Sequence, residues 1–200
     1  MTIKIKVILG TTRQRRFGDK PAHWIAEEAR TLPDVEVELL DLRDYPLKFF
    51  DEPMSPMWSK GQYADAAVQR WADRIADGDA FIIVTGEYNH GYPAVLKNAI
   101  DYIYPEWGNK PVGFVSYGNA GGARAIEQLR QVVVEMQMVP IRSAIHIPVP
   151  VYLAVMNEQV PARSELFQPL KEGRVNYVER FFTELLWSAR ALKEARTVVL

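Results

Sequence analysis

Five apolar runs, separated by stretches of helical periodicity, set the strongest limit on how this 200-residue chain can fold. The strand-like runs are residues 3–9, 35–40, 80–85, 111–117 and 139–147. The helical patterns cover residues 19–31, 62–76, 94–103, 123–138 and 175–192. Strands that alternate with helices form a mostly parallel sheet with helices on both faces. We therefore predict an α/β fold with a doubly wound five-stranded parallel sheet in the order 2-1-3-4-5.

Composition excludes several classes of protein. The 24 basic and 25 acidic residues nearly cancel, so no overall field favours nucleic acid. The sequence has no apolar run of about 18 residues, and its first residues alternate rather than forming a signal peptide. The absence of cysteine excludes disulfides, iron–sulfur clusters, thiolate zinc sites and a cysteine nucleophile. We expect a cytoplasmic protein with one domain and no membrane or nucleic-acid partner.

Three glycine-containing polar loops indicate where a ligand binds. They follow the first, third and fourth strands and read GTTRQRRFG, GEYNHGYP and YGNAGG. The loops after the second and fifth strands are not rich in glycine. In a sheet of this order, ligands bind beyond the carboxyl ends of the strands, at the switch point between strands 1 and 3. The three loops therefore predict one shared ligand site.

The first loop has the chemistry of a phosphate site. Gly10 allows a sharp turn, and a helix pattern with Pro21 in its first turn begins near Asp19. The free N–H groups of a helix N-terminus attract an anion, and nearby hydroxyls and arginines add donors. The loop is neither a Walker A motif nor a dinucleotide fingerprint. Its alternative interpretation is a solvated basic turn.

The second and third loops could hold a flat heteroaromatic ring. Tyr88 could form a wall against the ring, while Asn89 and loop N–H groups could bond to its polar edge. The alternative is a turn in which Asn and Gly serve only their backbone conformations. The third loop, residues 116–122, would approach the other edge of the ring, although tight strand-to-helix turns often have this composition.

Together these motifs make the chain resemble the NAD(P)H-dependent FMN reductases, a flavodoxin-like family that includes quinone, azo-dye and chromate reductases. The matching segments are GTTRxxRFG, GEYNHGYPAVLKNAIDY and SYGNAGGARA, and the resemblance covers residues 3–147. It implies noncovalent FMN, which accepts a hydride from NADPH or NADH and passes electrons to a small acceptor such as a quinone or flavin. It also implies a homodimer or homotetramer. Residues 151–200 would then be a C-terminal extension of the single FMN-binding domain, ending in an amphipathic helix.

The resemblance assigns a set of cofactor-binding residues. Around the phosphate they are Thr11, Arg13, Arg16, Phe17 and Gly18, and along the ring they are Gly86, Glu87, Tyr88, Asn89, Ser116, Tyr117 and Gly118. Gly86 stands where the family usually has proline, and Gly18 where serine is common. Arg124 corresponds to an arginine that lies near a subunit contact in relatives.

Several residues keep alternative roles. His90 is a candidate proton donor, with solvent as the alternative source, while His23 and His146 are expected to be structural. Arg15 or Arg16 could meet the 2′-phosphate of NADPH, or could be solvated or serve subunit contacts. The three histidines show no spacing that suggests a metal site.

The apolar loop at residues 46–60 has two interpretations. Its large side chains could pack on the domain itself or cover the flavin of a neighbouring subunit. Trp187 and Phe181, on the flank of the last helix, could extend an interface. An alternative function is that of a flavodoxin-like FMN electron carrier without NAD(P)H activity, and a third is a flavin-free regulatory protein. Carriers are typically acidic, so the near-neutral charge of this chain favours the enzyme.

Overall fold

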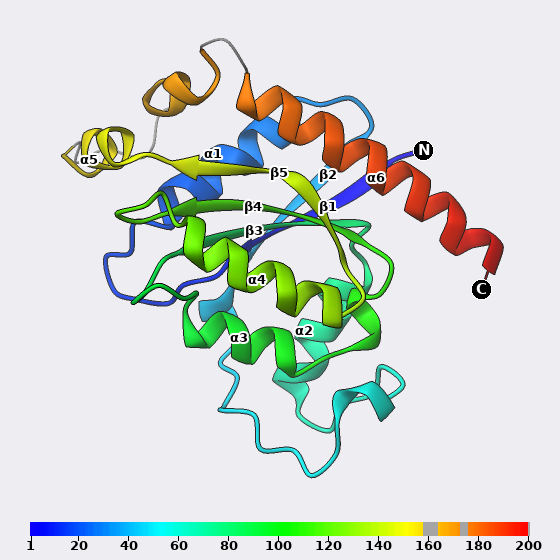
Figure 1. The fold of residues 1–200 in the computed structure, drawn as a ribbon. Coiled ribbons are helices and arrows are strands. Elements are labelled where there is room, and N and C mark those ends of the chain that lie inside the picture. The colour runs from blue at the N-terminus through cyan, green and yellow to red at the C-terminus, as the bar shows by residue number, and fades with distance from the viewer. Residues whose placement is uncertain (158–163, 173–175, 200) are drawn as a thin grey trace.

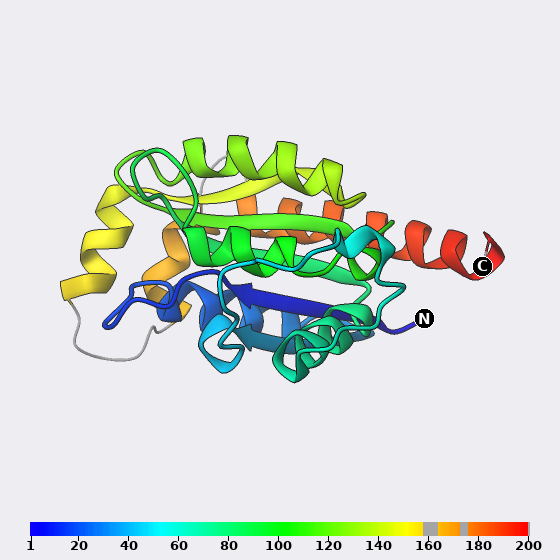
Figure 2. The same ribbon diagram turned by 90° about the horizontal axis from the view of Figure 1, so that it is seen from below.

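The computed structural model describes residues 1–157, 164–172 and 176–199 of the chain. Its centre is one parallel sheet in the order β2-β1-β3-β4-β5, as the sequence predicted, with helices on both faces (Figures 1 and 2). The strands are β1 (Ile3–Leu9), β2 (Val35–Asp41), β3 (Ala80–Gly86), β4 (Pro111–Tyr117) and β5 (Val139–Ile147). In the parallel register Leu9 pairs with Val84 and with Asp41. The strands therefore end level with one another, and the loops that follow them share one edge of the sheet.

The helices form two layers. One face is covered by α1 (Asp19–Arg30), α5 (Val149–Asn157), the 3₁₀ segment η4 (Ser164–Leu170) and α6 (Tyr177–Val199). The other is covered by α2 (Ala66–Ala76), α3 (Ala94–Asp101) and α4 (Ala123–Glu135). Alternate residues of β3 enter the two cores, Ile82 on one side and Ile83 on the other, which explains its continuous apolar run. The described helices include none that is both long and apolar enough to cross a membrane.

Several element boundaries differ from the prediction. α2 begins at Ala66 rather than residue 62, because the carboxylate of Asp65 accepts the N–H groups of Ala67 and Val68 and caps the helix there. α4 ends at Glu135, since Gln137 adopts a left-handed backbone conformation with φ of 59°. The sequence pattern did not predict α5 or η4. The predicted start of the last helix, Val175, lies outside the described residues.

The last helix packs as part of the core. Phe181 is fully buried against β4, where a Cβ atom on Gly113 would lie 2.5 Å from its ring. Phe181 therefore belongs to the core, and the expectation that it extends an interface was wrong. Trp187, by contrast, is 74% exposed. Figures 1 and 2 show α6 running along the sheet and projecting beyond it at the C-terminal end.

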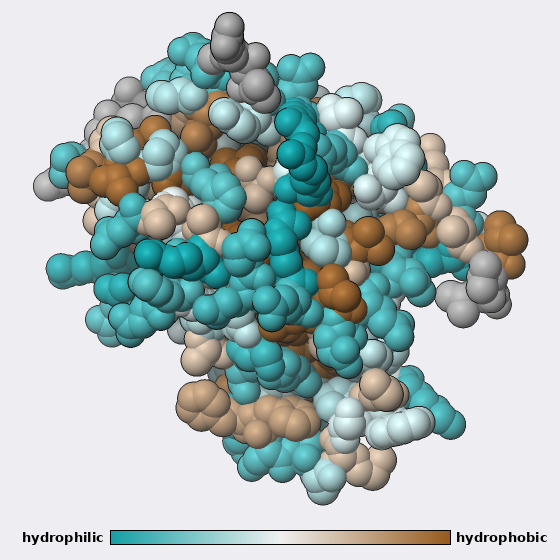
Figure 3. All heavy atoms as spheres, in the orientation of Figure 1, coloured by the Kyte–Doolittle hydropathy of each residue, from teal (hydrophilic) through white to brown (hydrophobic). Residues whose placement is uncertain are grey.

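The apolar loop of residues 46–60 leaves large side chains in solvent. Phe49 and Trp58 are 82% and 68% exposed, and Figure 3 shows hydrophobic side chains on the lower part of the surface, where this loop runs. Leu47 and Phe50 pack against the core, the Phe50 ring lying 5.3 Å from that of Tyr102. Packing on the domain therefore accounts for only some of the apolar side chains in this loop.

Candidate functional site

The three predicted loops meet at the carboxyl edge of the sheet. Gly10 donates its N–H to the carbonyl of Val84 (2.9 Å), which joins the first loop to β3. Glu87 donates its N–H to the carbonyl of Tyr117 (3.0 Å), which joins the second loop to β4. The three loops thus form one continuous, hydrogen-bonded edge, as expected for the switch point of this sheet.

The ring of Tyr117 lies between the first and second loops. A Cβ atom on Gly18 would lie 2.8 Å from the Tyr117 hydroxyl, and one on Gly86 would lie 2.9 Å from the ring. Both glycines are needed because the ring approaches their Cα atoms so closely. Phe17 packs against the same ring with a centroid distance of 4.8 Å. Burial raises the pKa of Tyr117 to about 12, so its hydroxyl is protonated at neutral pH and can donate a hydrogen bond.

Thr11 is the polar residue that the fold leaves unsatisfied at this edge. Its side chain is fully buried, and its hydroxyl makes no hydrogen bond within the described part of the chain. The Thr11 hydroxyl lies close enough to the Tyr117 hydroxyl to oppose the rise in its pKa, but the two groups do not meet the geometry of a hydrogen bond. A buried hydroxyl without a partner costs about 1–3 kcal/mol, so it points to a ligand. The start of α1 beside it has no side-chain cap at Gly18, which leaves N–H groups for an anion.

Arg16 holds the first loop in place. Its guanidinium bonds to both carboxylate oxygens of Asp41, to the carbonyl of Thr11 and to Asp19. Burial alone would raise the pKa of Asp41, but the hydrogen bonds from Arg16 and from the Arg43 N–H outweigh it and lower that pKa. With its donors already occupied, Arg16 fits a role in positioning the loop better than direct contact with FMN or with the 2′-phosphate of NADPH.

Tyr88 and Arg13 connect the first loop to the second. The guanidinium carbon of Arg13 lies 5.6 Å from the centroid of the Tyr88 ring, a cation–π contact. Tyr88 and Gly91 exchange backbone hydrogen bonds of 2.8 and 3.0 Å across a tight turn. Asn89 and His90 form the tip of this turn with φ values of 50° and 71°, and both are exposed. Asn89 therefore serves the backbone conformation of the turn, as the alternative interpretation held, whatever its side chain binds.

Glu87 and Ser116 hold the second and third loops together. The Glu87 carboxylate is nearly buried and accepts hydrogen bonds from the guanidinium and the backbone N–H of Arg124, which lower its pKa. The Ser116 hydroxyl donates to the carbonyl of Gly121 (2.7 Å) and lies 2.9 Å from Nδ1 of His146. Both side chains thus have intramolecular partners, and His146 has the structural contact expected of it.

Comparison with known protein families identifies the family to which this chain belongs. Residues 3–149 match the family model of the NADPH-dependent FMN reductases. The chain belongs to this family. It is an FMN oxidoreductase dependent on NAD(P)H, as the three motifs predicted.

Individual relatives of the FMN reductase family agree. An NAD(P)H-dependent FMN reductase of Schizosaccharomyces pombe is 39% identical over 150 residues, covering 74% of this chain and 75% of the relative. A 2-hydroxy-1,4-benzoquinone reductase of Burkholderia sp. is 32% identical over 148 residues, covering 70% of this chain and 74% of the relative. The structure of FerB, a flavoenzyme NAD(P)H:(acceptor) oxidoreductase of Paracoccus denitrificans, shares the fold with a TM-score of 0.69. It has 24% identity and covers 94% of this chain and 99% of its own.

The structure also shows residues that hold the loops near the site and that the sequence interpretation missed. Asp41 ends β2 and anchors Arg16, while Arg43 binds the carbonyl oxygens of Thr12 and Arg13. The family motif LKNAID contains Asn98, whose amide binds the Phe50 N–H (2.9 Å) and the carbonyl of residue 48 (2.6 Å). An aspartate directly after the second strand, in VELLDLRD, was the available signal for the first of these.

Proposed function

We propose that this chain transfers electrons from NADPH or NADH to a small acceptor such as a quinone or free flavin, with FMN held at the three-loop edge. The observation that supports this placement is the unpaired, buried hydroxyl of Thr11 beside the uncapped start of α1. When bound, FMN supplies the redox chemistry by accepting a hydride from the nicotinamide and passing electrons to the acceptor. The residues of the chain bind and orient it.

The phosphate end would lie against the first loop. The hydroxyls of Thr11 and Tyr117 both lie beside Gly18, where α1 begins without a side-chain cap: a Cβ atom on Gly18 would be 3.0 Å from the first and 2.8 Å from the second. Arg13 is exposed and adds positive charge from the rim, while Phe17 supports the Tyr117 ring. This donor set is neutral at its centre and cationic at its edge, which suits a phosphate group.

The flavin ring would lie along the second and third loops. Tyr88 offers an aromatic face, while Gly86 makes room for the Tyr117 ring and Gly118 lets the third loop approach Glu87 of the second. The exposed turn of Asn89 and His90 presents polar groups beside it. Glu87 and Ser116 would act by fixing the two loops, because their polar atoms already bond within the protein. His90 would protonate the reduced acceptor, with solvent as the competing source.

The acceptor, the assembly and the location are further parts of the proposal. The relatives named as FMN and quinone reductases favour a small, flat acceptor. The exposed apolar side chains of residues 46–60 favour a homodimer or homotetramer, in which a second subunit covers them. A cytoplasmic location agrees with the absence of cysteine.

Flavin content and bleaching test this function. The purified protein, supplied with FMN, should be yellow and should lose its colour when NADPH or NADH is added without air. A protein that binds FMN but does not bleach would instead be the electron carrier. A protein that takes up no FMN would be neither the reductase nor the electron carrier.

Comparing the rates with NADPH and with NADH tests whether Arg15 contacts the nicotinamide cofactor. If Arg15 meets the 2′-phosphate of NADPH, Arg15→Ala should lower the rate with NADPH relative to NADH. An unchanged ratio would exclude that role for Arg15.

A further inference from the structure

A segment between β5 and α6 packs along α1. It consists of α5, η4 and the two residues after η4, that is residues 149–157 and 164–172, and we call it the strap. The match to the family model ends at residue 149, the first residue of the strap. Figures 1 and 2 both show α5 beside the first loop and the start of α1. The strap therefore lies almost entirely outside the part of the chain that matches the family, yet it reaches the ligand edge.

Two contacts join the strap to the start of α1. The rings of Tyr152 and Phe17 lie 4.6 Å apart between centroids, and Phe17 precedes the helix by two residues. Nζ of Lys20, in the first turn of α1, donates to the carbonyl of Val155 (2.5 Å). One contact is apolar and the other is a hydrogen bond from a charged group, so together they fix both the position and the direction of α5 against the helix.

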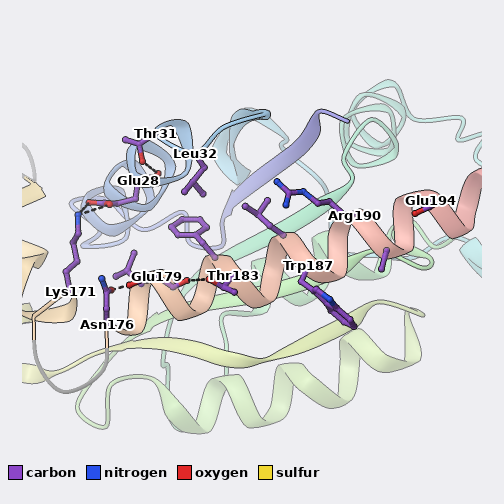
Figure 4. A pocket seen from close by; sticks show the side chains of 14 residues that line it. Glu28, Thr31, Leu32, Lys171, Asn176, Glu179, Thr183, Trp187, Arg190 and Glu194 are labelled. Carbon is purple, nitrogen blue, oxygen red and sulfur yellow. Dashed lines mark hydrogen bonds and ion pairs between the residues drawn. The ribbon is translucent and has the colours of Figure 1, made fainter.

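Two further contacts continue along the same side of α1. Trp24 stacks on Phe167 with the ring centroids 4.5 Å apart, and both side chains are buried. The Lys171 ammonium then binds the carboxylate of Glu28 (3.0 Å), a pair that Figure 4 shows beside the cavity between α1 and α6. The four residues on the α1 side stand at positions 17, 20, 24 and 28. Spacings of three and four residues form one stripe of a helix, so the strap covers a single face of α1.

Tyr152 reaches the phosphate end of the site through Phe17. The Phe17 ring contacts the Tyr152 ring on the strap and the Tyr117 ring at the ligand edge, at 4.6 and 4.8 Å. Phe17 immediately precedes Gly18, where α1 begins without a side-chain cap and where the Tyr117 hydroxyl lies. A row of three aromatic rings thus connects the strap to the uncapped N–H groups of the helix.

α5 contributes packing rather than charge. Its nine residues, VPVYLAVMN, include no acidic or basic side chain, so the helix offers no cation to a phosphate group. Its inward residues Val151 and Val155 are buried in the same apolar core as Phe17. Any effect of α5 on an anion beside Gly18 therefore acts through the position of the first loop.

We propose that the strap holds the phosphate site in its binding conformation and that Tyr152 is the positioning residue through which it acts. The inference rests on the proposed binding of the FMN phosphate at the first loop. With Phe17 and Lys20 held by the strap, the start of α1 needs less ordering when the ligand binds, which strengthens binding. Because such coupling is reciprocal, bound FMN in turn holds the strap against α1.

Binding of FMN and of riboflavin isolates the phosphate end, because riboflavin has the same ring system without the phosphate. We expect Tyr152→Ala to lower the affinity for FMN about fivefold to tenfold, as the loss of one aromatic contact predicts, and to change the affinity for riboflavin less than twofold. Tyr152→Phe keeps the ring and should bind FMN like the parent. Leu153→Ala is the matched control, since Leu153 is the next residue of the helix and is 50% exposed. It should change neither affinity.

Hydrogen exchange provides a second measurement that needs no variant. Saturating FMN should slow the exchange of the amides of residues 149–157 at least threefold in the parent protein, whereas saturating riboflavin should leave it unchanged. This experiment tests the coupling directly if Tyr152→Ala fails to fold. The circular dichroism of Tyr152→Phe and Leu153→Ala should match that of the parent.

The outcomes separate this inference from the proposed function. The strap does not position the phosphate site if Tyr152→Ala weakens FMN and riboflavin equally, or if it binds FMN like the parent. The same conclusion follows if Tyr152→Phe binds FMN as poorly as Tyr152→Ala, or if FMN protects the strap no more than riboflavin does. In each of these cases a parent that binds FMN still supports the proposed function. A parent that binds FMN no better than riboflavin would instead refute the proposed phosphate site, and this inference with it.

Discussion

Arg16 and Asp41 join the first ligand loop to the end of β2 by a two-point ion pair. Nη1 of Arg16 lies 2.7 Å from Oδ1 of Asp41, and Nη2 contacts the other carboxylate oxygen. The Arg16 side chain is only 2% exposed, and the same guanidinium holds the carbonyl of Thr11. The loop therefore has its shape before any ligand binds, which lowers the cost of ordering it around a phosphate.

Removing Arg16 should destabilise the protein and weaken flavin binding together. Arg16→Met leaves the half-buried Asp41 carboxylate unpaired, so we expect a loss of about 3 kcal/mol in the free energy of unfolding. We also expect the affinity for FMN to fall about tenfold, because the loop loses its anchor. Urea unfolding and fluorescence titration with FMN measure the two effects.

The matched control for this variant is Lys97→Met. Lys97 and Asp101 form an exposed pair at 2.5 Å within one helix, which contributes less than about 1 kcal/mol. If Arg16→Met unfolds at the same urea concentration as Lys97→Met, the buried ion pair is not what holds the loop.

Thr11→Val should separate stability from binding. The hydroxyl has no partner within the described protein, so its replacement by a methyl group should leave the flavin-free protein equally stable or stabilise it. A hydroxyl that bonds to a phosphate contributes about 1.5–3 kcal/mol, so the affinity for FMN should fall between tenfold and a hundredfold. Calorimetry of the flavin-free protein and FMN titration test both parts.

Thr85→Val is the control for Thr11→Val. Thr85 is equally buried, but its hydroxyl contacts the carbonyl of Gly86 at 3.2 Å. Its removal should lower stability, in contrast with Thr11→Val. Loss of stability in Thr11→Val with unchanged FMN affinity would show that the hydroxyl serves the fold and not a ligand.

Gly86→Ala should displace Tyr117 and disturb the ligand edge. The new Cβ atom would lie 2.9 Å from Cε2 of Tyr117, a ring held between the loops with little room to shift. Overpacking of this kind costs about 1–3 kcal/mol, and FMN affinity should fall with it. Gly91→Ala is the comparison, because its Cβ atom would approach only the flexible end of Gln128, at 3.0 Å. Equal losses of thermal stability in the two variants would contradict the prediction.

Lys110 should make stability depend on pH in the alkaline range. Burial, with the nearby charge of Arg196, lowers its pKa to about 7 from 10.5. Its amine bonds to the carbonyls of Ile75 (2.9 Å) and Ala76 (2.8 Å), and a neutral amine still has two N–H groups for them. Between about pH 7 and 10.5 the unfolded chain keeps a proton that the folded chain releases. The free energy of unfolding should therefore rise with pH, by up to about 1.4 kcal/mol per unit.

Denaturation of the parent and of Lys110→Met across pH 6–10.5 measures this contribution. Below about pH 7 the amine is protonated in both states, so it should add no pH dependence there. The rise above pH 7 should be absent from Lys110→Met. If both proteins show the same slope, the amine is charged in the folded protein throughout this range.

The architecture could be predicted because its signals are local. Apolar runs of strand length alternate with helical periodicity, and the rules for parallel connections then leave few topologies. The same order places the loops after β1, β3 and β4 at one edge, so the region of the site followed from the sequence. The ends of the helices were predicted less accurately, because the cap by Asp65 and the left-handed conformation of Gln137 each depend on a single residue.

The roles of individual side chains were decided by tertiary structure. Sequence alone could not tell that Arg16 is occupied by Asp41, 25 positions away, or that Tyr117 fills the space beside Gly18 and Gly86. Phe181 and Trp187 belong to the same helix, yet one is buried against Gly113 and the other is exposed. The sequence by itself determined the strand order and the ligand edge, because hydrophobic periodicity and turn residues act over a few positions. Which donors stay free for a ligand depends on contacts between distant residues, and only the folded chain brings those together.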